Sequence, residues 1–166
     1  ASDVYKRQDL YYARNGPVHD ELATLVLEFF TPLVGDATRH RASRCNAMLA
    51  IGELYRVESH SPSVRPVPWG EALPVLVQAL ADPNQIDSVR VAALIGIYRH
   101  ARLESDNYRI PTQDRDQIRA ELLKLAETKG DPRRSEEGQV WLRSRAMEVL
   151  GALRDPGPQN AVVKAL

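Results

Sequence analysis

The sequence has little of several features that mark whole classes of protein. Cys45 is the single cysteine among 166 residues, so no internal disulfide can form, and its place in a helical pattern predicts a small buried side chain. Lysine plus arginine and aspartate plus glutamate each number 22, which gives a formal net charge of zero. Nucleic-acid-binding proteins usually carry a basic excess that neutralises phosphates. This balance therefore disfavours a nucleic-acid partner while leaving a local basic patch open.

Long apolar runs and motifs of catalysis are also missing. No stretch approaches the roughly twenty apolar residues that cross a bilayer, so we expect no membrane span and a soluble segment. There is no glycine-rich phosphate loop, no Gly-x-Ser-x-Gly and no nucleophile beside an identifiable base, which predicts no catalytic residue. The histidines show no metal-ligand spacing, so we expect neither a metal nor another cofactor. They are His19, His40, His60 and His100.

What the sequence does contain is an internal repeat. Three stretches, Arg44–Leu54, Arg90–His100 and Arg143–Leu153, each open on arginine, with an alanine three positions later and a branched aliphatic seven positions later. The spacing between the arginines is close to the roughly 40–47 residues expected when two helices make one unit of a stacked array. The equivalent alanines are Ala47, Ala93 and Ala146, and the equivalent aliphatics are Ile51, Ile97 and Leu150.

A second amphipathic segment precedes each arginine-led stretch. Its apolar residues follow the spacing of one helix face, and turn-forming residues such as Gly35-Asp36 and Asp82-Pro83 come between the two segments. The predicted apolar faces are Leu22, Leu25, Val26, Phe29 and Leu33 in the first unit, Leu73, Leu76, Val77 and Leu80 in the second, and Ile118, Leu122, Leu125 and Ala126 in the third. Each unit is therefore predicted to be a helical hairpin, and the fold all-α.

Glycines at matching positions of the first and third stretches support this alignment. A glycine inside a helix costs roughly 1 kcal/mol relative to alanine. Gly52 and Gly151 therefore predict a close approach between the two helices of a hairpin, and in the second stretch the glycine is displaced to Gly96.

The resulting map has three hairpins with open ends. Residues 2–8 resemble one reading frame of the transposase mosaic-end adapter used in DNA sequencing, so residues 1–8 are predicted to be a non-native tail. This interpretation makes the sequence a fragment of a longer protein, truncated at both ends, and for that reason no compartment is predicted. The predicted segments are an irregular lead-in at 9–17, the first repeat at 18–56, a loop at 57–67, the second repeat at 68–103, a loop at 104–111, the third repeat at 112–154 and the start of a further helix at 155–166.

The middle unit resembles the HEAT repeat family. Glu71–Asp82 carries a proline in its first helix and an aspartate at the turn, and Val89-Arg90 opens the second helix, as in that family. The third unit departs from the pattern through an insertion at Arg133–Gly138. The resemblance implies a right-handed α-solenoid of about three HEAT-like hairpins in which second helices line a concave face. It also implies a scaffold that binds protein, since most proteins of this architecture are scaffolds. A minority of them resemble DNA-repair glycosylases or bilin lyases.

The repeated arginines have two interpretations. In the favoured one, Arg44, Arg90 and Arg143 form an internal ladder that pairs with turn aspartates such as Asp36 and Asp82. In the other, they form a cationic strip that grips an acidic partner.

Positions that face away from the alanines and aliphatics are predicted to contact a protein partner. Leu49 and Ile95 are apolar on this side of the second helices, which indicates either a small groove for a partner helix or the wide apolar arc of stacked helices. The whole predicted contact set is Arg41, Leu49, Glu53, Ile95, Arg99, Arg145 and Glu148.

These features favour a non-catalytic scaffold that binds protein through its second-helix face. An alternative is a nucleic-acid-acting enzyme of the HEAT-like glycosylase type, suggested by the arginines and by Trp69 and Trp141. We instead predict that both tryptophans are packing anchors, with Pro68-Trp69 opening a helix. A third alternative is a spacer in a larger multidomain enzyme.

Overall fold

The computed structural model describes residues 16–59, 61, 63–128, 130 and 135–165. Within these residues the all-α prediction is confirmed. The helices are α2 (Pro17–Gly35), α3 (Arg41–Gly52), α4 (Ala72–Ala81), α5 (Asp87–Leu103), α6 (Thr112–Glu127), α7 (Glu136–Leu153) and the short α8 (Ala161–Ala165), which follows a 3-10 turn at Pro158–Asn160. The tail predicted at 1–8 and most of the lead-in at 9–17 lie outside the described residues.

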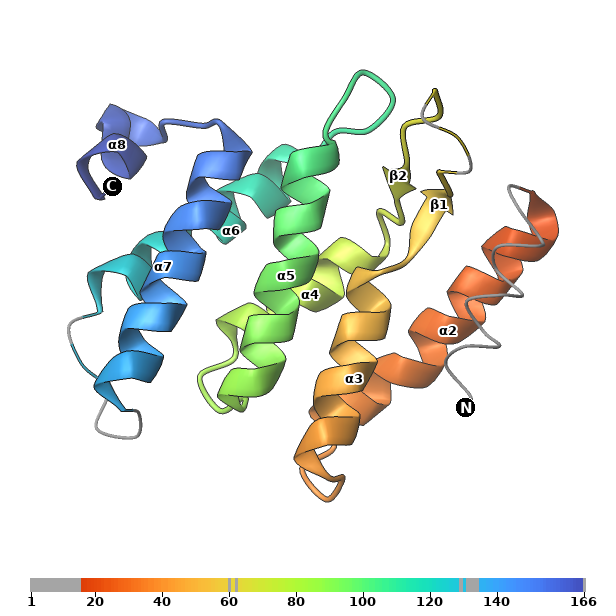
Figure 1. Cartoon of the computed structure of the whole chain (residues 1–166), viewed down its shortest axis with the longest axis horizontal. Helices are drawn as coiled ribbons and strands as arrows, with labels where there is room; N and C mark the ends of the chain where they lie inside the picture. The colour runs from red at the N-terminus through yellow and green to blue at the C-terminus, as the bar shows by residue number, and fades with distance from the viewer. Residues whose placement is uncertain (1–15, 60, 62, 129, 131–134, 166) are drawn as a thin grey trace.

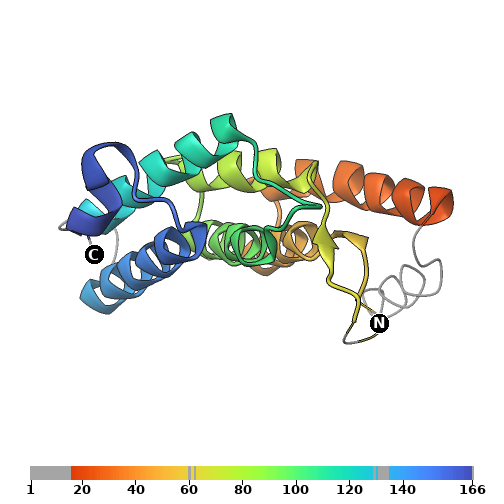
Figure 2. The same cartoon turned by 90° about the horizontal axis from the view of Figure 1, so that it is seen from above.

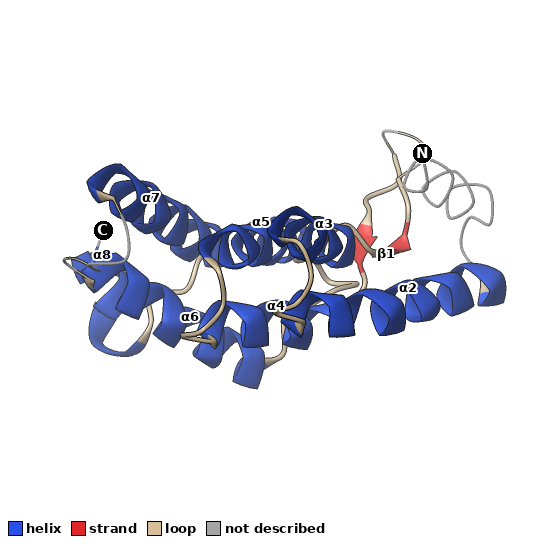
Figure 3. Ribbon diagram, turned by 90° about the horizontal axis from the view of Figure 1, so that it is seen from below, coloured by secondary structure: helices blue, strands red, loops and turns tan. Residues whose placement is uncertain are grey.

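The helices stack as hairpins in two layers (Figures 1 and 2). Helices α2, α4 and α6 make one layer, which α8 extends beside α6, and helices α3, α5 and α7 make the other. The view from below shows the same two layers (Figure 3). Each second helix packs on its own first helix and on the second helix of the neighbouring hairpin.

Local signals in the sequence account for several helix ends. Pro17 occupies the first turn of α2, where its missing N–H has no intrahelical acceptor to lose. The Nδ1 atom of His40 accepts a hydrogen bond from the backbone N–H of Ala42 and caps α3. Ser135 caps α7 by accepting from the N–H of Gly138, so Glu136–Gly138, predicted as part of an insertion, are the first turn of a helix.

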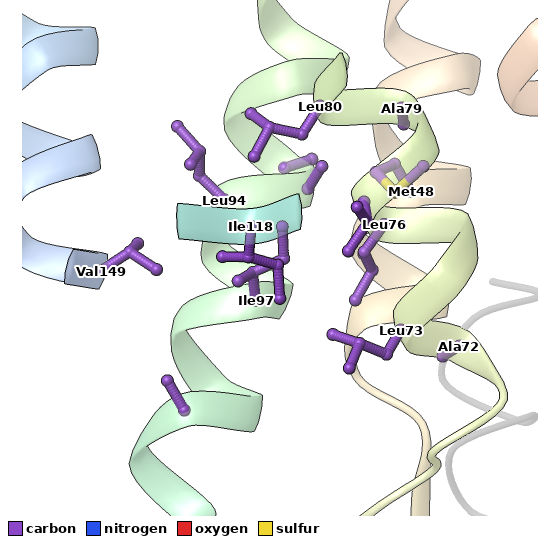
Figure 4. Close-up of a cluster of buried hydrophobic side chains, with 14 of the residues drawn as sticks. Met48, Ala72, Leu73, Leu76, Ala79, Leu80, Leu94, Ile97, Ile118 and Val149 are labelled. Carbon is purple, nitrogen blue, oxygen red and sulfur yellow. The ribbon is translucent and has the colours of Figure 1, made fainter. Parts of the chain in front are cut away.

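The repeated alanines and aliphatics occupy equivalent places in one continuous core. All six have exposed fractions of 0–1 %. Figure 4 shows Met48, Leu76, Leu94 and Ile118 gathered in this core from the four helices α3 to α6. Burial of this apolar surface is the main source of stability for a fold of this kind.

The apolar face predicted for α2 is wrong in part. Leu25 and Phe29 are 50 % and 61 % exposed. The helix instead packs through Ala23, Phe30 and Val34, a face rotated by about one residue. Apolar residues lie on both faces, so the periodicity alone could not choose between them.

The glycine prediction also needs correction. Gly52 and Gly96 do approach closely, but they join α3 to α5, the second helices of neighbouring hairpins, rather than the two helices of one hairpin. A Cβ on residue 52 would lie 2.9 Å from the Cα of Gly96, and the Leu76 side chain of α4 closes the contact from the other layer. Close approach is needed here because the second helices lie side by side within their layer.

The loop predicted at 57–67 is flanked by a short antiparallel pair of strands, β1 (Tyr55–Val57) and β2 (Val67–Pro68). Pro68 therefore belongs to a strand, and α4 begins only at Ala72. The backbone N–H of Trp69 bonds the carbonyl of Leu54, which continues the strand pairing and delays the helix. The prediction that Pro68-Trp69 opens a helix is wrong.

Candidate functional site

The three repeated arginines make the same backbone contact in each hairpin. Arg44 Nε donates to the carbonyl of Val34 at 3.0 Å, and Arg90 Nε donates to the carbonyl of Leu80 at 3.2 Å. Arg143 Nε donates to the carbonyl of Ala126 at 2.9 Å. Each arginine thus satisfies a carbonyl in the last turn of the first helix, where no intrahelical partner is present.

The ladder of arginines exists, but the aspartates predicted as its partners have other roles. Asp36 accepts from the backbone N–H and the hydroxyl of Thr38 and pairs with Arg39. The hydrogen bond from the Thr38 hydroxyl is the largest influence that lowers the pKa of Asp36. Asp82 accepts from the backbone N–H of Asn84. Both aspartates stabilise their own turns, because a short carboxylate side chain reaches the backbone two residues ahead.

The burial of Arg44 and Arg90 favours the internal ladder over an exposed cationic strip. Arg44 and Arg90 are only 7 % and 8 % exposed. Arg44 also donates through Nη2 to Gln85 Oε1 at 2.6 Å, and this buried bond joins the first hairpin to the second. The first two guanidinium groups therefore face the protein interior, which contradicts the alternative of an exposed strip.

One cleft bordering the described residues lies between the starts of α3 and α5. It has a volume of about 870 Å³, and Arg41 is the one member of the predicted contact set that lines it. Cys45 is half-buried in its wall, where Sγ donates to the carbonyl of Ser88 at 3.4 Å, and burial raises the pKa of the thiol. The cysteine predicted to be buried is only partly buried, because it lies at the seam between two second helices. The cleft is lined by His40, Arg41, Ala42, Cys45, Asn46, Pro83, Asn84, Gln85, Ile86, Asp87 and Ser88.

Farther along the same two helices, Glu53 and Arg99 come together. Arg99 Nη2 lies 3.8 Å from Glu53 Oε1, and Arg99 Nη1 donates to the carbonyl of Gly52 at 2.7 Å. Ile95 is 38 % exposed, whereas Leu49 is partly buried and packs against the core. Leu49 therefore fits the wide apolar arc expected of stacked helices, whereas Ile95 remains partly exposed on α5.

The last two predicted residues lie on α7. Arg145 Nη1 and Glu148 Oε2 are 2.5 Å apart, on the exposed side of that helix. Trp141 is 42 % exposed and lies beneath the Arg145 guanidinium, whose carbon is 5.4 Å from the ring centroid. The prediction of two buried tryptophan anchors holds for Trp69, which is 4 % exposed, and is wrong for Trp141.

A second cleft, of about 370 Å³, was not expected from the sequence. It is bordered by Arg56, Glu71 and Tyr108, and the Arg56 guanidinium pairs with Glu71 and lies 4.6 Å from the Trp69 ring centroid. The residues come from β1, the turn before α4 and the loop after α5. No spacing in the sequence connects these segments.

Behind Tyr108 lies a buried histidine. His100 is fully buried, and its Nδ1 atom is hydrogen-bonded to the Tyr108 hydroxyl. Burial lowers the pKa of His100 to about 4, with Arg99 as a lesser cause, and burial also raises the pKa of Tyr108. The imidazole is therefore neutral at physiological pH and acts as part of the core.

Within the described ranges, no group of three or more histidine, cysteine, aspartate or glutamate side chains is arranged to hold a metal ion. None of the helices in the described part of the chain is both long enough and apolar enough to cross a membrane. Comparison of the chain with known protein families, with curated proteins and with solved structures finds no match.

Proposed function

We propose that this chain is a non-catalytic scaffold of the HEAT-like α-solenoid type that binds protein partners through its second-helix layer. The cleft between the starts of α3 and α5 is the observation that carries the proposal. It is a preformed concavity, and it lies at the junction of two repeat units. Binding sites are commonly concave and formed before the ligand arrives.

The chemistry of the cleft suits an extended peptide segment. Arg41 and Asp87 bring charges of opposite sign, Ile86 and Pro83 bring apolar surface, and Asn46 brings an amide that can both donate and accept. A peptide backbone needs both donors and acceptors, and mixed charges favour a partner of mixed charge. We expect Glu53, Arg99 and Ile95 to extend the contact along the same two helices.

The zero net charge and the internal bonding of Arg44 and Arg90 favour protein over nucleic acid as the partner. A phosphate backbone is bound chiefly by exposed cations that release counterions. A glycosylase-type activity or a spacer role has no specific contact among the described residues in its favour.

A peptide-display selection tests this proposal. A random peptide library is selected on the wild-type protein, and the dissociation constants of the selected peptides are measured by fluorescence anisotropy. Arg41→Glu should weaken binding about tenfold or more, since it reverses the charge at the cleft wall. Lys124→Glu makes the same change of charge on exposed α6, where the side chain is 72 % exposed, and should leave binding unchanged.

The proposal fails if no peptide is selected, or if the two variants weaken binding equally. An electrophoretic mobility shift assay with short DNA duplexes at low salt is run in parallel with the peptide selection. Salt-sensitive retention of DNA would support the nucleic-acid alternative instead.

A further inference from the structure

The exposed side of α7 carries one continuous ridge of solvent-exposed residues. Trp141, Ser144, Glu148 and Gly151 follow spacings of three, four and three residues, which places them along one side of the helix. All four are exposed. In Figure 1, α7 is the last labelled helix of the second layer, and this layer ends there in the described part of the chain.

Gly151 is the unusual member of this ridge. It occupies the position equivalent to Gly52, where the missing Cβ admits Gly96 of the neighbouring helix. Nothing among the described residues lies within 4 Å of a Cβ placed on Gly151. A glycine in an exposed helix interior costs roughly 1 kcal/mol relative to alanine, and in the isolated chain no packing compensates for it.

The two ends of the ridge have complementary shapes. Trp141 is a large projection and Gly151 is a notch, separated by about 15 Å along the helix axis at 1.5 Å per residue. If two copies of α7 meet antiparallel about a two-fold axis near the level of Ala146, each Trp141 lies over Gly151 of the other copy. The same arrangement sets Ser144 opposite Glu148. An isologous contact requires a surface that is complementary to itself, and this ridge meets that requirement.

We propose that this ridge is the contact surface for a second copy of the chain, joined antiparallel through α7. The charges permit it, because the chain has no net charge and the two charges at the centre of this surface, Arg145 and Glu148, neutralise each other in an ion pair. A single pair of helices buries an area at the low end of specific interfaces, so the dimer is weak and reversible. This surface lies on α7 and is independent of the cleft between α3 and α5.

Sedimentation velocity across the micromolar range tests the association. The wild-type protein should pass from monomer to dimer as its concentration rises, and Gly151→Glu should weaken the association about tenfold or more, because it fills the notch with a charge. Ala120→Glu, on an exposed position of α6, is the matched control and should dimerise like the wild type. Circular dichroism confirms that each variant is folded.

Cross-linking tests the antiparallel register. In a Cys45→Ser background, the single variants Ser144→Cys and Glu148→Cys are mixed and oxidised. The antiparallel contact predicts that a disulfide between the two different variants forms faster than a disulfide between identical ones, because residue 144 faces residue 148. Faster formation between identical variants overturns the register. A monomer at every concentration, or equal dimerisation of Gly151→Glu and the wild type, overturns the proposal.

Discussion

Gly52 lies so close to Gly96 that residue 52 cannot carry a side chain unless one of the two helices moves. A Cβ on residue 52 would be 2.9 Å from the Gly96 Cα, and a Cβ on residue 96 would be 2.8 Å from a methyl carbon of Leu76. The first conflict is with backbone, so rotation of a side chain cannot relieve it. The separation of α3 and α5, and with it the spacing of the first two hairpins, depends on both glycines.

We expect Gly52→Ala to destabilise the protein by about 1–3 kcal/mol, because overpacking outweighs the better helix propensity of alanine. Gly151→Ala makes the same change at the equivalent position of α7, where no described atom lies within 4 Å. It should stabilise the monomer by about 0.5–1 kcal/mol. Urea unfolding at low protein concentration measures both changes. If both variants are stabilised, the close approach of α3 and α5 is not required for folding.

The arginine ladder predicts a ranking of stability losses. Arg44→Ala removes bonds to the Val34 carbonyl and to Gln85, both in a buried setting, and should cost about 1–3 kcal/mol. Arg143 is partly exposed, and Arg143→Ala, which removes the bond to the Ala126 carbonyl in a less buried setting, should cost less, about 0.5–1.5 kcal/mol. Arg44→Lys should recover little, because lysine has no planar fork of donors. Thermal melts measure the ranking, and equal losses in the two alanine variants would contradict the role of burial.

His100 should make the fold sensitive to mild acid. Its pKa is lowered to about 4 in the folded protein, mainly by burial, from an ordinary value of 6.5. The unfolded chain therefore binds the proton more readily, so stability is full above pH 6.5 and falls as the pH drops from 6.5 towards 4. The loss attributable to this residue should reach about 3 kcal/mol near pH 4.

The comparison that isolates this effect uses His100→Gln, which cannot take up a proton. The difference in unfolding free energy between wild type and variant, measured by urea titration from pH 7 to pH 4, should change steadily across this range. A difference that stays constant with pH would show that protonation of His100 is not coupled to unfolding. Tyr108→Phe removes the hydroxyl bonded to Nδ1 and separates the loss of that bond from the titration.

The internal repeat made the helical hairpins predictable, and the limits of the prediction also have physical causes. The alanine and aliphatic positions were correct because a buried helix face repeats every three to four residues and tolerates no polar side chain there. The partner of Arg44 was not predictable, because the Val34 carbonyl carries no signal in the sequence. An aspartate at the turn was the visible candidate, yet its carboxylate is engaged by Thr38.

The candidate site was predicted less well than the core. Arg41, a predicted contact residue, lines the cleft, but the amides of Asn84 and Gln85 and the Ile86 side chain come from the turn between α4 and α5. Only the stacking of neighbouring units brings that turn to α3. Ala92 lies on the side of α5 opposite its alanine and aliphatic core positions, yet it is 1 % exposed because α5 also packs against α3 of the neighbouring unit.

A last prediction concerns the connection between the second and third hairpins. Glu104 accepts a hydrogen bond from the backbone N–H of Ile110 at 2.8 Å and pairs with Arg115, which donates to the carbonyl of Leu153 at 3.0 Å. These bonds join the loop after α5 to the start of α6 and the end of α7. Glu104→Ala should therefore cost about 1–3 kcal/mol, because it leaves partly buried donors without a partner.

An exposed ion pair in the same loop provides the matched control. Asp106 pairs with Arg109, but the two side chains are 98 % and 71 % exposed, so Asp106→Ala should change stability by less than about 0.5 kcal/mol. Hydrogen exchange at the Ile110 amide should accelerate markedly in Glu104→Ala and remain unchanged in Asp106→Ala. Equal effects of the two substitutions would mean that the loop is held by its backbone alone. The larger loss at Glu104 would show that one partly buried carboxylate ties the loop after α5 to α6 and, through Arg115, to the end of α7.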